Sequence, residues 1–161
     1  DPLVIVNGIL VDATAAKGNA TIPNNVTIIN PWAFENCSEL TGVTIPDSVI
    51  NIGEAAFTNC ENLADVTISN RITKINDRTF YNCTSLTNIS LPEDLVSIGE
   101  YAFCNCNRLT SIIFPDKLVS IGSCAFSSCN FTSITLPASV KDIGEGAFED
   151  SYNLCDIYIQ G

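Results

Sequence analysis

The sequence repeats itself every 23 residues, and this period limits the possible folds more than any other feature. Five phenylalanines follow one another at this interval, from Phe34 to Phe126, and a cysteine lies three residues after each. These cysteines are Cys37, Cys60, Cys83, Cys106 and Cys129. A fixed period of about 20 to 50 residues is typical of solenoids and related repeat folds. We therefore expect a stack of similar coils.

Six copies of the repeat can be aligned, and the fifth is one residue shorter than the others. Their bounds are 22–44, 45–67, 68–90, 91–113, 114–135 and 136–158. In the short copy, Phe131 is expected to fill a leucine position from a tightened loop after Cys129. In the sixth copy, Ser151 takes the cysteine position. Residues 22–161 are thus expected to form one solenoid.

Each copy contains two kinds of pattern, as the second copy illustrates. Residues around Val66 and Ile68 alternate between apolar and polar side chains, which predicts a strand. Ala56, Phe57 and Cys60 follow the i, i+1, i+4 spacing of one face of a helical turn. We therefore expect an α/β solenoid of about six 23-residue coils, with parallel strands on one face and short helical or 3₁₀ turns on the other. Neighbouring coils must stack, because one copy is too small to bury a core alone.

The first 21 residues lie outside the repeat. Two short apolar runs flank Asn7-Gly8, a strong signal for a β-hairpin. We expect a hairpin over residues 1–21 that caps the first coil.

The eight cysteines do not have the spacing of a disulfide scaffold. The five at the 23-residue interval are expected to form a buried column of reduced thiols. Cys104 and Cys124 occupy outward positions on adjacent coils, where a disulfide between them is a further candidate. No metal site is expected from Cys104 and Cys106, because one of the two should face the core.

Composition excludes several classes of function. The formal net charge of −11 opposes binding to nucleic acid, and the absence of histidine excludes catalysis or metal binding by an imidazole. No apolar run reaches the roughly 20 residues of a membrane helix, so no membrane insertion is expected. Since methionine is also absent, we expect the sequence to be a piece of a longer protein.

The repeated pattern Ile-Gly-x-x-Ala-Phe-x-x-Cys, preceded by Leu-x-x-Ile-x-Ile-Pro, resembles the BspA-like leucine-rich repeat over residues 22–159. The resemblance implies a secreted or cell-surface protein of mouth or gut bacteria, or of mucosal protist parasites. It also implies adhesion to host extracellular-matrix proteins or to the surface of another microbe. No catalytic residue and no cofactor are implied by the repeat.

Outward side chains of the predicted strands are candidate binding residues. They are Thr44, Asp65, Thr67, Asn88, Ser90, Ser111, Ile113, Ser133, Thr135, Asp156 and Tyr158. Ile113 and Tyr158 interrupt a mostly small and polar series, which makes them the preferred contact residues. The alternative is structural: ladders of hydroxyl groups can satisfy one another and stabilise the sheet.

A second candidate surface lies on the opposite wall, where Trp32, Tyr81 and Tyr101 point outward. Exposed aromatic side chains are enriched in contact sites, although single ones are also common without a role. The leading interpretation of the chain is an extracellular protein-binding or adhesion module. The alternative is a passive stalk that presents other domains. An enzyme is disfavoured, because the pattern implies a filled rod without a cleft.

Overall fold

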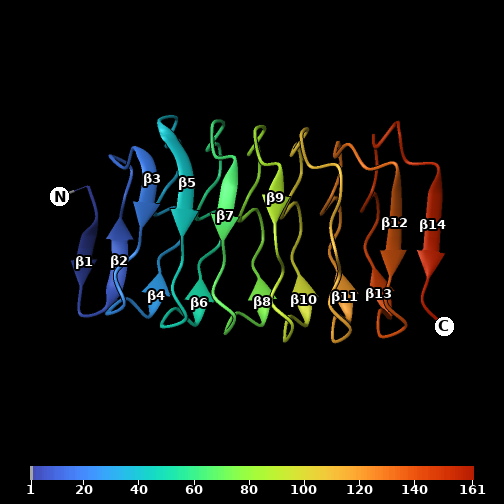
Figure 1. The fold of residues 1–161 in the computed structure, drawn as a ribbon, viewed down its shortest axis with the longest axis horizontal. Coiled ribbons are helices and arrows are strands. Elements are labelled where there is room, and N and C mark those ends of the chain that lie inside the picture. The colour runs from blue at the N-terminus through green and yellow to red at the C-terminus, as the bar shows by residue number, and fades with distance from the viewer. Residues whose placement is uncertain (1) are drawn as a thin grey trace.

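The computed structural model describes residues 2–161. The chain winds into an elongated solenoid of about seven coils, and the two termini lie at opposite ends of the stack (Figure 1). The described residues form strands and turns, with no helix among them. The expected repeat solenoid is therefore confirmed, but the fold is a β-solenoid and not the α/β fold that we predicted.

One wall of the solenoid is the strand face that the alternating pattern predicts. It contains a four-stranded parallel sheet of β3 (Gly18–Thr21), β5 (Leu40–Thr44), β7 (Asp65–Thr67) and β9 (Asn88–Ile89). It continues as a two-stranded parallel sheet of β12 (Ser133–Leu136) and β14 (Asp156–Ile159). These strands form the upper row of arrows in Figure 1.

A second strand wall forms the lower row of arrows in Figure 1, and sequence analysis did not predict it. Its first sheet has the order β1-β2-β4-β6, from β1 (Val4–Val6) through β2 (Ile9–Asp12) and β4 (Ile28–Ile29) to β6 (Asn51–Ile52). Its second sheet contains β8 (Lys74–Ile75), β10 (Ser97–Ile98), β11 (Ser120–Ile121) and β13 (Asp142–Ile143). Most of these strands have two residues, too few for an alternating pattern to reveal them.

The third wall, which carries the Phe and Cys positions, was predicted to be helical or 3₁₀, and this prediction is wrong. Phe34 donates its N–H to Ala56 O at 2.8 Å, and Asn36 donates to Thr58 O at 2.9 Å, so alternate amides bond the next coil. Cys37 instead donates back to Phe34 O at 3.1 Å, which closes a tight turn. Main-chain hydrogen bonds therefore close tight turns within each coil and also join each coil to the next. We call this third wall the turn wall.

Left-handed backbone geometry explains why the turn wall cannot be a helix. Trp32 has φ 57° and Asn36 has φ 58°, and the equivalent residues of the next copies also have positive φ. Such residues occur singly in turns because a left-handed conformation ends a right-handed helix. The i, i+1, i+4 apolar spacing is therefore produced by successive turns.

The N-terminal segment does not form the separate hairpin cap that was predicted for residues 1–21. β1 pairs antiparallel with β2 around Asn7-Gly8. β2, however, pairs in parallel with β4, and β3 pairs in parallel with β5. Residues 9–21 thus form an additional coil of the solenoid, and a hairpin cap over residues 1–21 is not supported.

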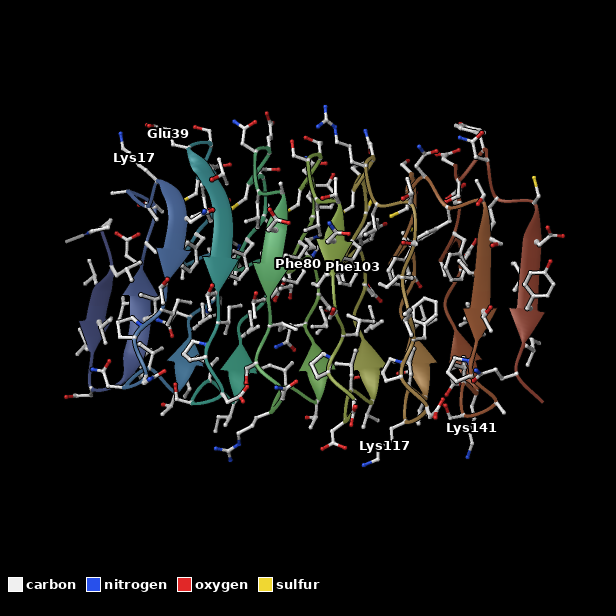
Figure 2. All side chains as sticks on the ribbon, in the orientation of Figure 1. Lys17, Glu39, Phe80, Phe103, Lys117 and Lys141 are labelled. Atoms are coloured by element: carbon white, nitrogen blue, oxygen red, sulfur yellow. The ribbon has the colours of Figure 1, made fainter. Side chains whose placement is uncertain are left out.

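The core is built from columns of identical side chains. Phe80 and Phe103, labelled in Figure 2, stack with ring centroids 5.3 Å apart and planes 19° apart. The same stacking continues from Phe34 to Phe148 along the solenoid. Because each ring covers its neighbours in the stack, the repeat period sets the core as well as the strands.

Glycine is needed where successive coils touch through their main chains in the second strand wall. A Cβ on Gly122 would lie 2.5 Å from the carbonyl carbon of Gly99. Asn76 takes this position in the third copy, and there the wall separates into two sheets, between β6 and β8. The Asn76 side chain donates from Nδ2 to Ile52 O at 2.6 Å, in place of the glycine N–H used elsewhere.

Candidate binding surfaces

The strand-face candidates all have exposed side chains. They are Thr44, Asp65, Thr67, Asn88, Ser90, Ser111, Ile113, Ser133, Thr135, Asp156 and Tyr158. Strand pairing aligns some of them in columns, with Thr44 opposite Thr67 and Thr135 opposite Tyr158. The structure therefore collects them on one face, as two groups around β5, β7 and β9 and around β12 and β14, with Ser111 and Ile113 between the groups.

The hydroxyl groups of this face do not form a ladder. Within residues 2–161, the threonine and serine hydroxyls of the candidate set make no hydrogen bond to protein. Asn88 makes a single long contact, from Nδ2 to Thr87 Oγ1 at 3.5 Å. The alternative in which these hydroxyls satisfy one another is therefore not what this structure contains, and the groups remain open to a ligand.

A gap divides the strand face between β9 and β12. Residues 111–114 lie between these strands, but they form no strand, and within the described chain their main-chain N–H and C=O groups make no hydrogen bond. β9 pairs only with β7, and β12 pairs only with β14. The candidates Ser111 and Ile113 therefore lie in an unpaired segment.

Extra aromatic volume lies next to this gap. Phe114 occupies a position that is Ile or Leu in the other copies. Its ring meets Phe126 edge to face at 5.5 Å, and Phe131 meets the same ring at 5.8 Å. Phe131 also belongs to the shortened copy, so three phenylalanine rings pack together in the coil that follows the unpaired residues 111–114.

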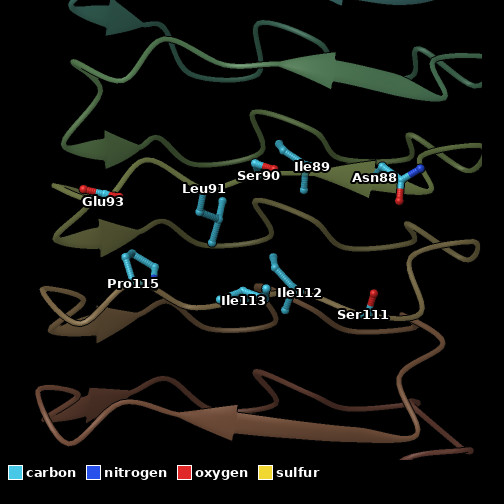
Figure 3. Close-up of a pocket in the computed structure, with 9 residues that line it drawn as sticks. All are labelled: Asn88, Ile89, Ser90, Leu91, Glu93, Ser111, Ile112, Ile113 and Pro115. Atoms are coloured by element: carbon cyan, nitrogen blue, oxygen red, sulfur yellow. The ribbon is translucent and has the colours of Figure 1, made fainter.

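A groove lies along the gap, and we call it the strand-face groove (Figure 3). Its volume is about 370 Å³. It is lined by Asn88, Ile89, Ser90, Leu91, Glu93, Ser111, Ile112, Ile113 and Pro115. Ile113 is 87% exposed, the highest exposure of any isoleucine in the described chain. The sequence suggested Ile113 as a contact residue but gave no sign of a groove around it.

The opposite wall brings two of its three aromatic candidates together. Tyr81 and Tyr101 meet edge to face at 6.4 Å, and the guanidinium of Arg78 lies 5.3 Å from the centre of the Tyr101 ring. Arg78 also forms an ion pair with Glu54 at 3.5 Å. Trp32, 51% exposed, lies in the first copy and apart from this cluster. The three aromatics thus do not form one site.

The column of five cysteines is buried and reduced. Each thiol donates to a main-chain carbonyl of the preceding coil, as Cys83 does to Phe57 O at 3.2 Å. Ser151 makes the equivalent bond to Phe126 O at 3.4 Å. Burial raises the pKa of Cys60 to about 12 and that of Cys129 to about 12. These thiols are therefore structural and poorly reactive at neutral pH.

Cys104 and Cys124 are free thiols on adjacent coils. Cys104 was expected to face outward, but its side chain is buried, and burial is the main cause that raises the pKa of its thiol. Cys124 is half-buried, and its side chain interacts with the Tyr101 hydroxyl, which raises the pKa of that tyrosine. A charge on Cys124 would also raise the pKa of Cys104. A disulfide between these two thiols on adjacent coils stays a prediction.

Sequence analysis missed a ladder of asparagine side chains on the turn wall. Asn59 donates from Nδ2 to Asn36 Oδ1 at 2.9 Å, Asn82 donates to Asn59 at 2.9 Å, and Asn105 donates to Asn82 at 2.7 Å. All four residues have positive φ, which asparagine tolerates better than most residues. The signal was present as an asparagine directly before the cysteine in four successive copies.

Two classes of site are not found in the part of the chain that the structure describes. No group of three or more Cys, Asp or Glu side chains in it is arranged to hold a metal ion. No helix in it has the length and apolar character needed to cross a membrane.

The fold and its exposed parallel strand face define a leucine-rich-repeat solenoid. The sequence matches the BspA type leucine rich repeat region in six copies, over residues 14–107 and 73–161. The chain belongs to this family. Proteins of the family are generally interaction or surface modules, and their solenoid is typically non-catalytic.

Solved structures support the same assignment. A leucine-rich repeat protein of T. pallidum is 31% identical with a TM-score of 0.89, and the match covers 93% of this chain and 73% of that protein. A leucine-rich cell surface protein of Faecalibacterium prausnitzii is 31% identical with a TM-score of 0.86, covering 94% of this chain and 42% of that one. A Eubacterium ventriosum leucine-rich repeat protein, 22% identical over 89% of this chain and 46% of that protein, with a TM-score of 0.72, shows the fold alone. A comparison with curated proteins finds no match.

Proposed function

We propose that this chain is a non-catalytic protein-binding module of a secreted or cell-surface protein, and that it acts in adhesion through its strand face. The observation that carries the proposal is the set of exposed hydroxyl groups on this face that have no partner in the protein. A hydroxyl group that is free in the unbound protein can bond a ligand without breaking an internal bond first.

The partner that fits this surface is another protein. The face is long and its exposed candidate side chains are mostly small and polar, and Tyr158 adds a side chain that is 55% exposed. Tyrosine is enriched among residues that dominate binding energy. The partner classes that we propose are host extracellular-matrix proteins and surface proteins of another microbe.

The test compares two triple variants on a panel of immobilised matrix and microbial surface proteins. The first variant changes Thr44, Thr67 and Thr135 of the strand face to alanine. We expect each lost hydrogen bond to weaken binding by about 0.5–1.5 kcal/mol, so the three together should raise Kd by tenfold or more.

A matched control changes Ile50, Thr73 and Val96 of the second strand wall to alanine. These side chains are also exposed, so the control has the same number of surface truncations on a different wall. We expect the control variant to bind as the unmodified protein does. Both variants should keep the melting temperature of the unmodified protein. Equal binding by all three proteins, or no capture of the chain by any panel member, would support a passive stalk instead.

A further inference from the structure

We propose that the strand-face groove binds an extended polypeptide segment that pairs with the main chain of residues 111–114. This inference rests on the proposed protein-binding function, and it specifies both a site and a mode of recognition. The partner is a strand-like segment in which apolar side chains alternate with lysine or arginine.

The first support is the unused hydrogen-bonding capacity of the main chain. In a regular parallel solenoid, each strand is paired on both sides by its neighbours. Residues 111–114 are paired on neither side, and β9 and β12 each leave the edge that faces them unpaired. An unpaired edge is a template on which another chain can add a strand. The groove offers such edges in the middle of an otherwise continuous face.

The second support is the apolar lining of the groove. Leu91 and Ile112 are half-buried and pack against the core, whereas Ile113 points its side chain largely into solvent. Strand addition gains specificity from pockets that accept alternate side chains of the bound segment. A volume of about 370 Å³ lies at the low end of the roughly 300–1,000 Å³ of ligand pockets, which suits one or two side chains of a peptide.

The third support is charge. Glu93 is the one charged residue that lines the groove; of the nearest cations in the sequence, Arg108 is exposed outside the lining and Lys117 is bonded to Asp94. The whole chain has a formal net charge of −11. A basic segment is therefore attracted to the groove. A second copy of this chain is disfavoured as the occupant, because two such acidic surfaces repel each other.

The experiment uses a synthetic probe whose main chain can be blocked. The probe is an acetylated and amidated ten-residue peptide of alternating valine and lysine, labelled with a fluorophore. A second peptide has the same sequence but carries an N-methyl group on every main-chain nitrogen, which removes the hydrogen-bond donors of both strand edges and keeps charge and side chains. We expect the unmethylated peptide to bind and the methylated peptide to bind about tenfold more weakly or worse, measured by fluorescence anisotropy.

Hydrogen exchange locates the bound peptide. In the free protein, the amides of residues 111–114 are expected to exchange rapidly, and the unmethylated peptide should slow them. Protection at the outer edge of β14 instead, equal binding of both peptides, or no binding at all would overturn the proposal.

Variants then separate the groove from the rest of the strand face. Ile113→Ser should weaken peptide binding, and Ile50→Ser is its matched control, because Ile50 is 50% exposed on the second strand wall. A double variant, Ile113→Thr with Phe114→Ile, gives this segment the residue types of Thr67 and Ile68 in a paired strand. If the gap is closed by this change, peptide binding is lost while the melting temperature holds or rises.

The two proposals fail in different ways. If the triple-threonine variant loses matrix proteins but the groove variants bind the peptide as the unmodified protein does, the groove proposal is wrong and the function stands. If the groove binds the peptide but no panel protein is captured, the adhesion proposal is wrong.

Discussion

The contact between Gly122 and the coil before it allows a direct test of how tightly the coils are stacked. We consider the change Gly122→Ala, which adds one methyl group. The φ of Gly122 is not in the left-handed region, so alanine can adopt the same backbone conformation. The added Cβ would lie 2.5 Å from Gly99 C and 2.6 Å from Glu100 N, where ordinary contact begins at 3.4 Å. The change therefore tests only whether there is room for a methyl group between Gly122 and the preceding coil.

The expected cost follows from the separation that the two coils must accept. To relieve the contact, they must move apart locally by about 0.9 Å. The Gly122 N–H then leaves Ile98 O, its acceptor at 2.8 Å, at a cost of about 0.5–1.5 kcal/mol. Overpacking typically costs about 1–3 kcal/mol more, and the entropy that alanine removes from the unfolded chain returns about 0.4–1 kcal/mol. These ranges combine to a net loss of about 0.5–4 kcal/mol, and we take the centre, about 2–3 kcal/mol, as the expected value.

The measurement is urea denaturation followed by circular dichroism, with hydrogen exchange of residues 97–99 and 120–122. For a chain of this length the loss corresponds to a fall in Tm of roughly 4–12 °C. The control is Gly161→Ala, because nothing lies within 4 Å of a Cβ at that position. A Gly122→Ala protein within 0.5 kcal/mol of the unmodified one would refute the reasoning, since it would show that the coils separate at no cost.

Three further predictions concern the cysteines and the asparagine ladder. The raised pKa values of Cys60 and Cys129 keep these thiols protonated in the folded protein while unfolded thiols ionise from pH 9.0 upward. Stability should therefore be unaffected by these groups below pH 9 and fall above it, by up to about 1.4 kcal/mol per thiol and pH unit until pH 12; urea denaturation at pH 8 and pH 10.5 checks this, and equal midpoints would contradict it. Oxidation with diamide, which takes up the two electrons and two protons of a dithiol, should link Cys104 to Cys124. Tandem mass spectrometry of the tryptic peptides, with fragment ions that separate Cys104 from Cys106 and Cys124 from Cys129, can show this link; a link within the buried column would contradict the assignment. Asn82→Ala should destabilise the protein by about 1–2 kcal/mol, because it removes two ladder bonds and leaves alanine at φ 57°, whereas Asn82→Gly should recover part of this loss in thermal denaturation.

The sequence was sufficient for the features that depend on the repeat period. Phe80 and Phe103 stack because they occupy equivalent positions in adjacent coils, and equivalent positions are visible in the sequence. The exposure of Thr67 and Thr135 follows in the same way from the two-residue period of a strand. Spacing therefore predicted which side chains share a column and, on the strand face, which are exposed to solvent, whereas Cys104, expected to face outward, is buried.

The sequence was not sufficient where one pattern fits two backbones. Ala56, Phe57 and Cys60 fit a helical turn, and they fit equally a pair of tight turns joined by a left-handed residue. The equivalents of Trp32 are alanine, arginine, tyrosine, cysteine and, in the sixth copy, Gly146, so the residue type signals the positive φ in that last copy alone. The asparagines before the cysteines carry a similar sign at the other positive-φ position.

The two interruptions of the strand walls differ in a way that bears on function. Asn76 breaks the second wall, but its side chain supplies the hydrogen bond that the missing glycine N–H would have made to Ile52. At residues 111–114 of the strand face, no side chain makes such a replacement. An unpaired edge invites aggregation unless it is guarded, and here acidic residues such as Glu93 oppose pairing between copies of the chain. Residues 111–114 thus make no main-chain pairs within the protein, and the acidic surface opposes pairing with a second copy of the chain. A basic strand, as proposed above, meets neither obstacle.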